Sequence, residues 1–501
     1  MDPVTLQVMS AALSGVAEEM AAALIRTAYS PNIKERRDCS TALFDAEGRL
    51  AVQSASIPVH LGAMPEAVAA VIAAGAAQGD VWAVNDPYRG GTHLPDLTLI
   101  APMVLAGEIM GYSVSRAHHA DIGGMSPGSM PSGSRELLQE GLVIPPVPLV
   151  RDGRPETAVM DLILANTRPP GERRGDLRAQ LACHARAQDR ISEVASRHGA
   201  ARITEAFSAV YSYSERRMRA ALAELPDGTW VAEDVLEGDG VTSESLTIRA
   251  AARIAGDALT VDFRGTAPAG PGNLNCPLAV TRSAVWFVLR SLTDPDIPAS
   301  AGAFAPVEII TEPGSLIDAR PPSAVAGGNV ETSSRIVDVV TAALAGAVAA
   351  PAAGQGTMNN LTIGNRDFTY YETLGGGQGA GPSGAGPSGV HVAMSNTLNT
   401  PVESLETAYP LRIERYEIRR GTGGAGRHRG GDGVRRDIRL LVDAEASLIT
   451  ERRENGPPGR EGGRPGAPGR NSLNGEVVGA KWRGRIRTGD VIRIDTPGGG
   501  G

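Results

Sequence analysis

Two histidines and an aspartate flank a predicted β-hairpin at positions where they could bind a metal ion. His93 and Asp96 precede its first strand-like run, His118 follows the second, and Ala106-Gly107 between the runs has the composition of a tight turn. If the turn centres on Ala106, opposed residue numbers sum to about 212, which sets His118 opposite Leu94. Two imidazoles and one carboxylate at the open end of a hairpin suit Mn, Zn or Fe and leave positions open for water or substrate.

The residues beside this set extend the possible chemistry. His119 and Asp121 directly follow and are candidates for orienting a ligand or moving protons. The alternative interpretation is structural, because polar side chains near a bend can satisfy one another without binding any ion. The spacing alone leaves both interpretations open, since a histidine three residues from an aspartate is common by chance.

Other motifs carry weaker signals. Cys39 has arginine neighbours that could lower a thiol pKa, but a cysteine at the start of a strand is more often packed. The glycine-rich segment 375–389 matches GxGxxG twice, yet prolines interrupt it and a strand-like run follows, which favours a mobile loop near substrate over a dinucleotide loop. The sequence contains no GxxxxGK[ST], so it has no Walker-type ATP loop, and no GxSxG precedes a predicted helix, so it has no nucleophile elbow.

The composition of the 501 residues excludes several classes of protein. Hydrophobic residues make up 42%, enough for a large core, so disorder is not expected. The net charge of −8 argues against binding to nucleic acid or to an anionic membrane surface. Three distant cysteines without a CxxC pair, and an N-terminus without a signal-peptide pattern, predict a cytoplasmic protein with free thiols. No apolar run of about 18 residues stands out as a membrane-spanning helix.

The periodicity predicts a mixed α+β fold in four consecutive regions. They are an α/β region with the histidines (1–150), a helical region (151–226), a second α/β region (227–354) and a β-rich region with glycine-rich loops (355–501). Helices are predicted at 5–28, 64–77, 160–224, 280–292 and 334–350. Strands are predicted at 41–45, 49–53, 81–84, 97–104, 108–116, 246–255 and 258–263.

Several long runs carry a family resemblance, in order from end to end. They include IPVHLGAMP (57–65), NDPYRGGTHLPD (85–96), SRAHHADIGGMSPGSMP (115–131), GGNVETS (327–333), YYETLGGGQGA (370–380) and NTLNTPVESLE (396–406). In these runs the chain resembles the B-type subunits of the hydantoinase/oxoprolinase family, to which the large subunits of acetone and acetophenone carboxylases are related. The resemblance implies a large, multi-layer hydantoinase-B-like architecture.

The resemblance also implies an enzyme built from two types of subunit. An A-type partner binds ATP and phosphorylates a carbonyl oxygen of the substrate, and the B-type subunit then hydrolyses the activated cyclic amide, a lactam or hydantoin, with a metal-activated water. Single-chain oxoprolinases place the A half first, so a separate A-type chain and a hetero-oligomer are expected here. The metal ligands of related carboxylases correspond to His93, Asp96 and His118, and Asp38 is implied as a polar active-site residue.

Two other functions stay open. The chain could be the large subunit of an ATP-dependent ketone carboxylase, which would consume bicarbonate. It could also be a scaffold without catalysis, in which case removing the metal would leave turnover intact. Hydrolysis is favoured because the match to hydantoinase-type chains is closer and longer, and because a scaffold has no need of clustered histidines and acids.

Overall fold

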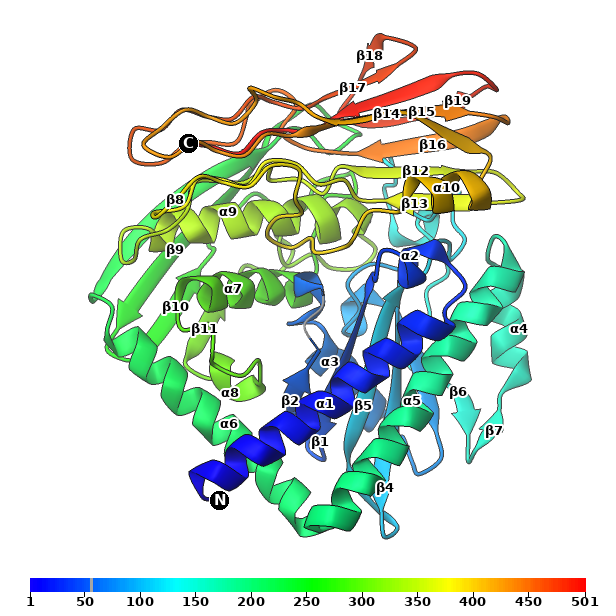
Figure 1. Cartoon of the computed structure of the whole chain (residues 1–501), viewed down its shortest axis with the longest axis vertical. Helices are drawn as coiled ribbons and strands as arrows, with labels where there is room; N and C mark the ends of the chain where they lie inside the picture. Colours follow the sequence, from blue (N-terminus) through cyan, green and yellow to red (C-terminus); the bar gives the residue numbers. More distant parts are fainter. Residues whose placement is uncertain (55–56) are drawn as a thin grey trace.

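The computed structural model describes residues 1–54 and 57–501, and these form helices around four β-sheets (Figure 1). This confirms the predicted mixed α+β class. The N-terminal sheet has seven antiparallel strands in the order β2-β1-β5-β4-β3-β6-β7. Its strands are β1 (Cys39–Asp45), β2 (Leu50–Gln53), β3 (Val81–Val84), β4 (Asp96–Leu105), β5 (Glu108–His118), β6 (Val147–Arg151) and β7 (Arg154–Pro155).

Helices cover both faces of this sheet. α1 (Pro3–Thr27) and α5 (Pro170–His198) pack on one face, and α3 (Met64–Ala73) packs on the other. Within β1, Leu43 joins the cluster formed with α1 and α5, whereas its neighbour Phe44 joins the cluster formed with α3. Successive side chains of a strand point to opposite faces, so all seven residues of β1 are buried.

The first helix is stabilised by an N-terminal cap, by a stripe of buried apolar side chains and by an ion pair to α5. Asp2 caps it by accepting a hydrogen bond from the Thr5 amide at 3.0 Å. By length and composition alone α1 could cross a membrane, a property that it shares with core helices of folded domains. Here an ion pair of 2.6 Å between Glu19 and Arg186 joins it to α5. The buried stripe consists of Met9, Leu13, Val16, Ala17, Met20 and Leu24.

The predicted helical region consists of three helices. They are α4 (Thr157–Ala165), α5 and α6 (Ala200–Ala223). The break between α5 and α6 lies at Gly199, whose φ of +88° favours glycine. In Figure 1, α5 and α6 run along the lower edge of the molecule and enclose α1.

A second sheet follows, in the order β11-β10-β9-β8. α9 packs against its strands β8 and β9 and against α7, and a five-residue π-helix, Gly328–Thr332, leads directly into α9. The bounds are β8 (Gly228–Leu236), β9 (Leu246–Ala255), β10 (Ala258–Asp262), β11 (Val307–Ile310), α7 (Leu278–Leu292), α8 (Ala301–Phe304) and α9 (Ser333–Leu344).

The C-terminal region forms two stacked sheets, seen at the top of Figure 1. Their orders are β13-β12-β16-β19 and β14-β15-β20-β17-β18, and apolar side chains such as Leu448 and Ile494 fill the space between them. The elements are β12 (Asn360–Gly364), β13 (Thr369–Glu372), α10 (Val402–Ala408), β14 (Leu411–Ile418), β15 (Val434–Leu440), β16 (Ala444–Ile449), β17 (Arg470–Leu473), β18 (Glu476–Val478), β19 (Lys481–Ile486) and β20 (Val491–Asp495).

Glycine-rich segments pack backbone against backbone beside these sheets. The amide of Gly499 donates to Gly431 at 2.9 Å, the amide of Ala380 donates to Gly500 at 2.9 Å, and the amide of Gly424 donates to Gly499 at 2.8 Å. A β-carbon on Gly499 or on Gly424 would overlap a backbone carbonyl oxygen of a neighbouring segment, so these positions require glycine. The expectation of a mobile loop is wrong for 375–380, which is almost entirely buried in this glycine-rich wall.

One hydrophobic cluster joins all four predicted regions. It contains Val114 of β5, Leu222 of α6, Val340 of α9 and Ile449 of β16. The four regions are therefore stretches of sequence that share a core, and their boundaries stay a prediction.

Candidate metal centre

The hairpin of β4 and β5 brings the predicted ligands together. Asp96, the first residue of β4, pairs directly with His118, the last residue of β5. His93 lies in the turn before β4, where its carbonyl accepts a hydrogen bond from the Asp96 amide at 3.1 Å. One possible ligand atom from each of the three residues lies within 4.8 Å of the other two, and all three side chains are buried.

The register of the hairpin differs from the predicted one. Near the turn, Leu105 pairs with Glu108, but a β-bulge between Met103 and Val104 adds a residue to the pairing. The turn itself centres between Ala106 and Gly107, which shifts the pairing by one residue, and the bulge shifts it by a second, so His118 lies opposite Asp96 and not opposite Leu94. The bulge therefore moves the carboxylate itself into register with the imidazole.

Buried side-chain atoms without a hydrogen-bond partner show whether these residues could hold a cation. Among the described residues, neither ring nitrogen of His93 makes a hydrogen bond, and the same holds for Asp96 Oδ1 and His118 Nε2. Buried polar atoms without partners are costly, at about 1–3 kcal/mol each, and are rare in native proteins. His93 Nε2 lies 3.2 Å from Asp96 Oδ2, and a divalent cation could take one ring nitrogen of His93 together with Asp96 and His118 Nε2, so the residues present fit a metal ion.

The charge states also suit a metal ion. Burial lowers the pKa of His118 well below its usual value, which keeps the ring neutral, as a metal ligand must be. Burial alone would raise the pKa of Asp96, but the adjacent rings of His93 and His60 hold it well below its usual value. The site therefore offers an ionised carboxylate beside a neutral imidazole.

Residues from distant segments orient the ligands. Asn32, in the short helix α2 (Pro31–Lys34), donates to the His118 carbonyl at 2.7 Å, and its amide nitrogen lies 3.1 Å from His118 Nδ1. The Tyr371 ring of β13 stacks on the His118 ring at 4.2 Å. The Thr92 hydroxyl donates to Asp96 Oδ2, and His60 Nε2 lies 3.4 Å from the same oxygen. Such supporting contacts fix the direction of ligand atoms.

A small cavity opens beside the ligands. It measures about 20 Å³ for the centre of a water-sized sphere, which is room for little more than one water molecule. Asp38, Asp96, His118 and Asn329 are among its lining residues. Burial raises the pKa of Asp38 to about 6, although the nearby Arg36 guanidinium opposes this shift. The structure thus places Asp38 beside the ligands.

His119 and Asp121 point elsewhere. His119 follows His118 in the chain, and its Nε2 lies 2.9 Å from the Gln180 side-chain oxygen of α5. Asp121 accepts hydrogen bonds from three backbone amides and from Arg168. Neither residue lines the small cavity. Their present contacts are structural, and a catalytic role for either one stays a prediction.

Two further residues of the site carry no signal in the sequence beyond the motifs in which they lie. His60 lies in IPVHLGAMP and contacts Asp96, and Asn329 lies in GGNVETS. Asn329 is held by the π-helix before α9, lines the small cavity and has no hydrogen-bond partner for its side-chain oxygen among the described residues. π-Helical turns are often found at functional sites. Cys39 is buried, and burial raises the pKa of its thiol, which does not favour a nucleophile.

Comparison with known proteins places this centre in a family. Residues 2–501 match the family model described as hydantoinase B/oxoprolinase. The chain belongs to this family. It is 38% identical to 5-oxoprolinase 1 of Arabidopsis thaliana and 31% identical to the putative B-type chain of a D-/L-hydantoinase from a Pseudomonas species, in both cases over its whole length. It spans 42% of the Arabidopsis protein and 90% of the Pseudomonas protein.

Two solved structures have the same fold. The ATP-dependent caprolactamase of Pseudomonas jessenii superposes with a TM-score of 0.91 at 26% identity, covering 100% of this chain and 90% of that one. A nucleotide-free acetone carboxylase superposes with a TM-score of 0.90 at 18% identity, covering 100% of this chain and 75% of that one. At 18% identity the second likeness concerns the fold alone.

Proposed function

We propose that this chain is the B-type subunit of an ATP-dependent cyclic-amide hydrolase that acts with an A-type partner in the cytoplasm. The observation that carries the proposal is the set of unpartnered buried atoms on His93, Asp96 and His118, in a chain of the hydantoinase B/oxoprolinase family. The names of its relatives, 5-oxoprolinase, D-/L-hydantoinase and caprolactamase, all refer to cyclic amides.

His93, Asp96 and His118 would hold a divalent ion, with manganese, zinc and iron as candidates. Such an ion polarises a carbonyl oxygen and lowers the pKa of water, which is the chemistry needed to attack an amide. The buried setting strengthens every electrostatic interaction in the site because bulk water is excluded.

The chain's own residues would position and protonate the substrate. Asp38 lines the same cavity as two of the ligands, so its carboxyl can accept a proton during attack and return it to the departing ring nitrogen. The side-chain oxygen of Asn329 is a free acceptor in that cavity and suits the N–H group of a cyclic amide. We assign ATP binding and phosphorylation of the substrate to the A-type partner, because the sequence has no Walker-type loop.

The test is reconstitution with an A-type subunit, ATP and either 5-oxoproline or hydantoin. We expect ADP and a ring-opened acid as products, with turnover lost by orders of magnitude in His93→Ala and in His118→Ala. Metal content should fall in both variants, while circular dichroism stays unchanged because a chain of this size does not need the ion to fold. His198→Ala, at the exposed end of α5, serves as the control.

Two outcomes would contradict the proposal. Full metal content and full turnover in a folded His93→Ala variant would remove the ion from the mechanism. Consumption of bicarbonate with a ketone substrate, without hydrolysis of either cyclic amide, would instead identify a ketone carboxylase.

A further inference from the structure

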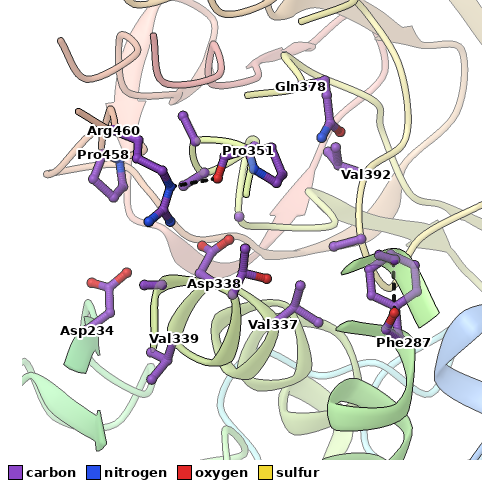
Figure 2. A pocket seen from close by; sticks show the side chains of 18 of the residues that line it. Asp234, Phe287, Val337, Asp338, Val339, Pro351, Gln378, Val392, Pro458 and Arg460 are labelled. Atoms are coloured by element: carbon purple, nitrogen blue, oxygen red, sulfur yellow. Dashed lines mark hydrogen bonds between the residues drawn. The ribbon is translucent and has the colours of Figure 1, made fainter. Parts of the chain in front are cut away.

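A second and much larger cavity adjoins the metal centre. It measures about 730 Å³, within the size range of small-molecule sites, and α9 forms its floor in Figure 2. Ser395 lines both this chamber and the small cavity at the metal centre, so the two spaces lie on either side of that residue. His391 Nδ1 lies 2.6 Å from the Ser395 hydroxyl and thereby holds the residue at the junction.

The chamber has an apolar end and a polar end. Figure 2 shows Phe287 and Val392 on one side, and Arg460 on the opposite side beyond Asp338. A cavity that is mostly apolar with a few placed polar groups is typical of a site for a small organic molecule. The polar groups at the far end therefore indicate which charge the ligand carries.

The charges at the polar end leave one guanidinium unpaired. Asp234 and Asp338 are both bound by Arg452, at 2.5 and 2.8 Å, and Arg335 lies behind them at 3.2 and 3.9 Å. Arg335 also lies 3.3 Å from Glu451, so the protein's own carboxylates hold both of these guanidiniums. Arg460 comes in addition, and no carboxylate lies within 4.0 Å of it in the part of the chain that the structure describes.

The Arg460 side chain is fixed in place while its terminal nitrogens stay available. Its Nε donates to the Pro351 carbonyl at 2.9 Å, and no other hydrogen bond of its guanidinium is present among residues 1–54 and 57–501. Two parallel N–H groups of a fixed guanidinium match the two oxygens of a carboxylate. A bound carboxylate would therefore occupy donors that the protein leaves free.

We propose that the chamber binds a carboxylate-bearing small molecule through Arg460 and that it is the route by which substrate or product passes the metal centre. This inference rests on the proposed function. Opening a cyclic amide with water breaks the C–N bond and leaves a carboxylate, together with an ammonium group from a lactam or a ureido group from a hydantoin, so every product of that reaction carries the group that Arg460 recognises. The small cavity has no room for a whole ring, so only the reacting amide would reach it while the rest of the molecule occupies the chamber beyond Ser395.

The test is binding of four probes to the purified chain without ATP or partner. 5-Oxoproline and 2-pyrrolidinone differ only by a carboxylate, and glutamate and 4-aminobutanoate are the corresponding ring-opened acids. By calorimetry and ligand-observed NMR, we expect 5-oxoproline to bind at least about 10-fold more tightly than 2-pyrrolidinone, as a charge-assisted pair at a partly exposed arginine would give. Tight binding of the opened acids instead would identify the chamber as a product site and equally support the proposal.

Two variants decide whether Arg460 is responsible. Arg460→Met should abolish the preference for the carboxylate, whereas Arg464→Met, an exposed arginine in the same glycine-rich segment, should retain it. Equal binding of all probes in wild type and Arg460→Met, or no binding of any probe, would overturn the proposal.

A third variant separates this proposal from the proposed function. His118→Ala should retain chamber binding even though it loses the metal. If His118→Ala abolishes binding and Arg460→Met does not, the carboxylate is held at the metal centre and the chamber assignment is wrong. Chamber binding that survives while turnover is absent in the reconstituted system would leave the chamber intact and refute the hydrolase.

Discussion

Adding one methyl group at Gly379 tests whether the glycine-rich wall of the chamber is rigid. A β-carbon at this position would lie 2.5 Å from the carbonyl carbon of Ala352, where ordinary contact begins at 3.4 Å. The carbonyl oxygen of Ala352 would be closer still, so Gly379→Ala requires the two segments to separate by more than about 0.9 Å. That separation strains the hydrogen bonds from Ala352 to Ala380 and from Ala380 to Gly500, each 2.9 Å long.

The expected cost follows from these contacts. Overpacking costs about 1–3 kcal/mol, and losing one buried backbone hydrogen bond costs about 1–3 kcal/mol more. The sum is about 2–6 kcal/mol. With an unfolding entropy of about 2.1 cal/mol/K per residue, a 501-residue chain loses roughly 1 °C in Tm for each kcal/mol. We therefore expect Tm to fall by about 2–6 °C in scanning calorimetry.

The control lies five residues away in the same segment. A β-carbon at Gly384 would meet nothing within 4 Å, and the backbone there does not have a positive φ. Gly384→Ala should therefore leave Tm within about 1 °C of the wild type. Equal Tm values for the two variants would refute the inference that backbone contact makes this wall rigid.

Three further predictions concern protons, substrate and nucleotide. Burial raises the pKa of Glu140 to about 7, above its unfolded value, so the folded state favours the protonated form and the free energy of unfolding should fall by about 3 kcal/mol between about pH 4.5 and 7. In urea unfolding, the free energy of unfolding of Glu140→Gln should fall less over this pH range than that of the wild type, by about 3 kcal/mol. The same pH dependence in both proteins would contradict the raised pKa of Glu140. Asn329→Leu should lower kcat/KM about 10-fold for a lactam with an N–H group and less for its N-methyl analogue, whereas equal losses would exclude Asn329 as the acceptor. The isolated chain should bind no ATP in calorimetry, and tight binding would contradict the division of labour between subunits.

Local patterns were sufficient to predict most elements and the proximity of His93, Asp96 and His118. The helix over α1, the hairpin β9–β10 and the strand β3 depend on periodicities and turns within a few residues, so their predicted bounds are close to the observed ones. His93, Asp96 and His118 lie on one hairpin, and a hairpin brings its open ends together whatever surrounds it. The predicted register was wrong by two residues, one because the turn centres between Ala106 and Gly107 and one because the bulge at Met103 depends on packing that the strand sequences do not specify.

The tertiary structure decided what surrounds the ligands. Asn32, Tyr371 and Asn329 reach the site from α2, β13 and the π-helix, through contacts between residues far apart in the chain. The contacts of His119 also depend on the tertiary structure. Its side chain points to the opposite side from that of His118, because neighbours in an extended chain alternate, and it finds a partner there only because α5 packs against that face. Sequence spacing determines which residues are neighbours along one helix or strand. Which residues are neighbours across the core follows only from how the sheets and helices pack, and that packing shapes the chamber and leaves Arg460 without an ion-pair partner among the described residues.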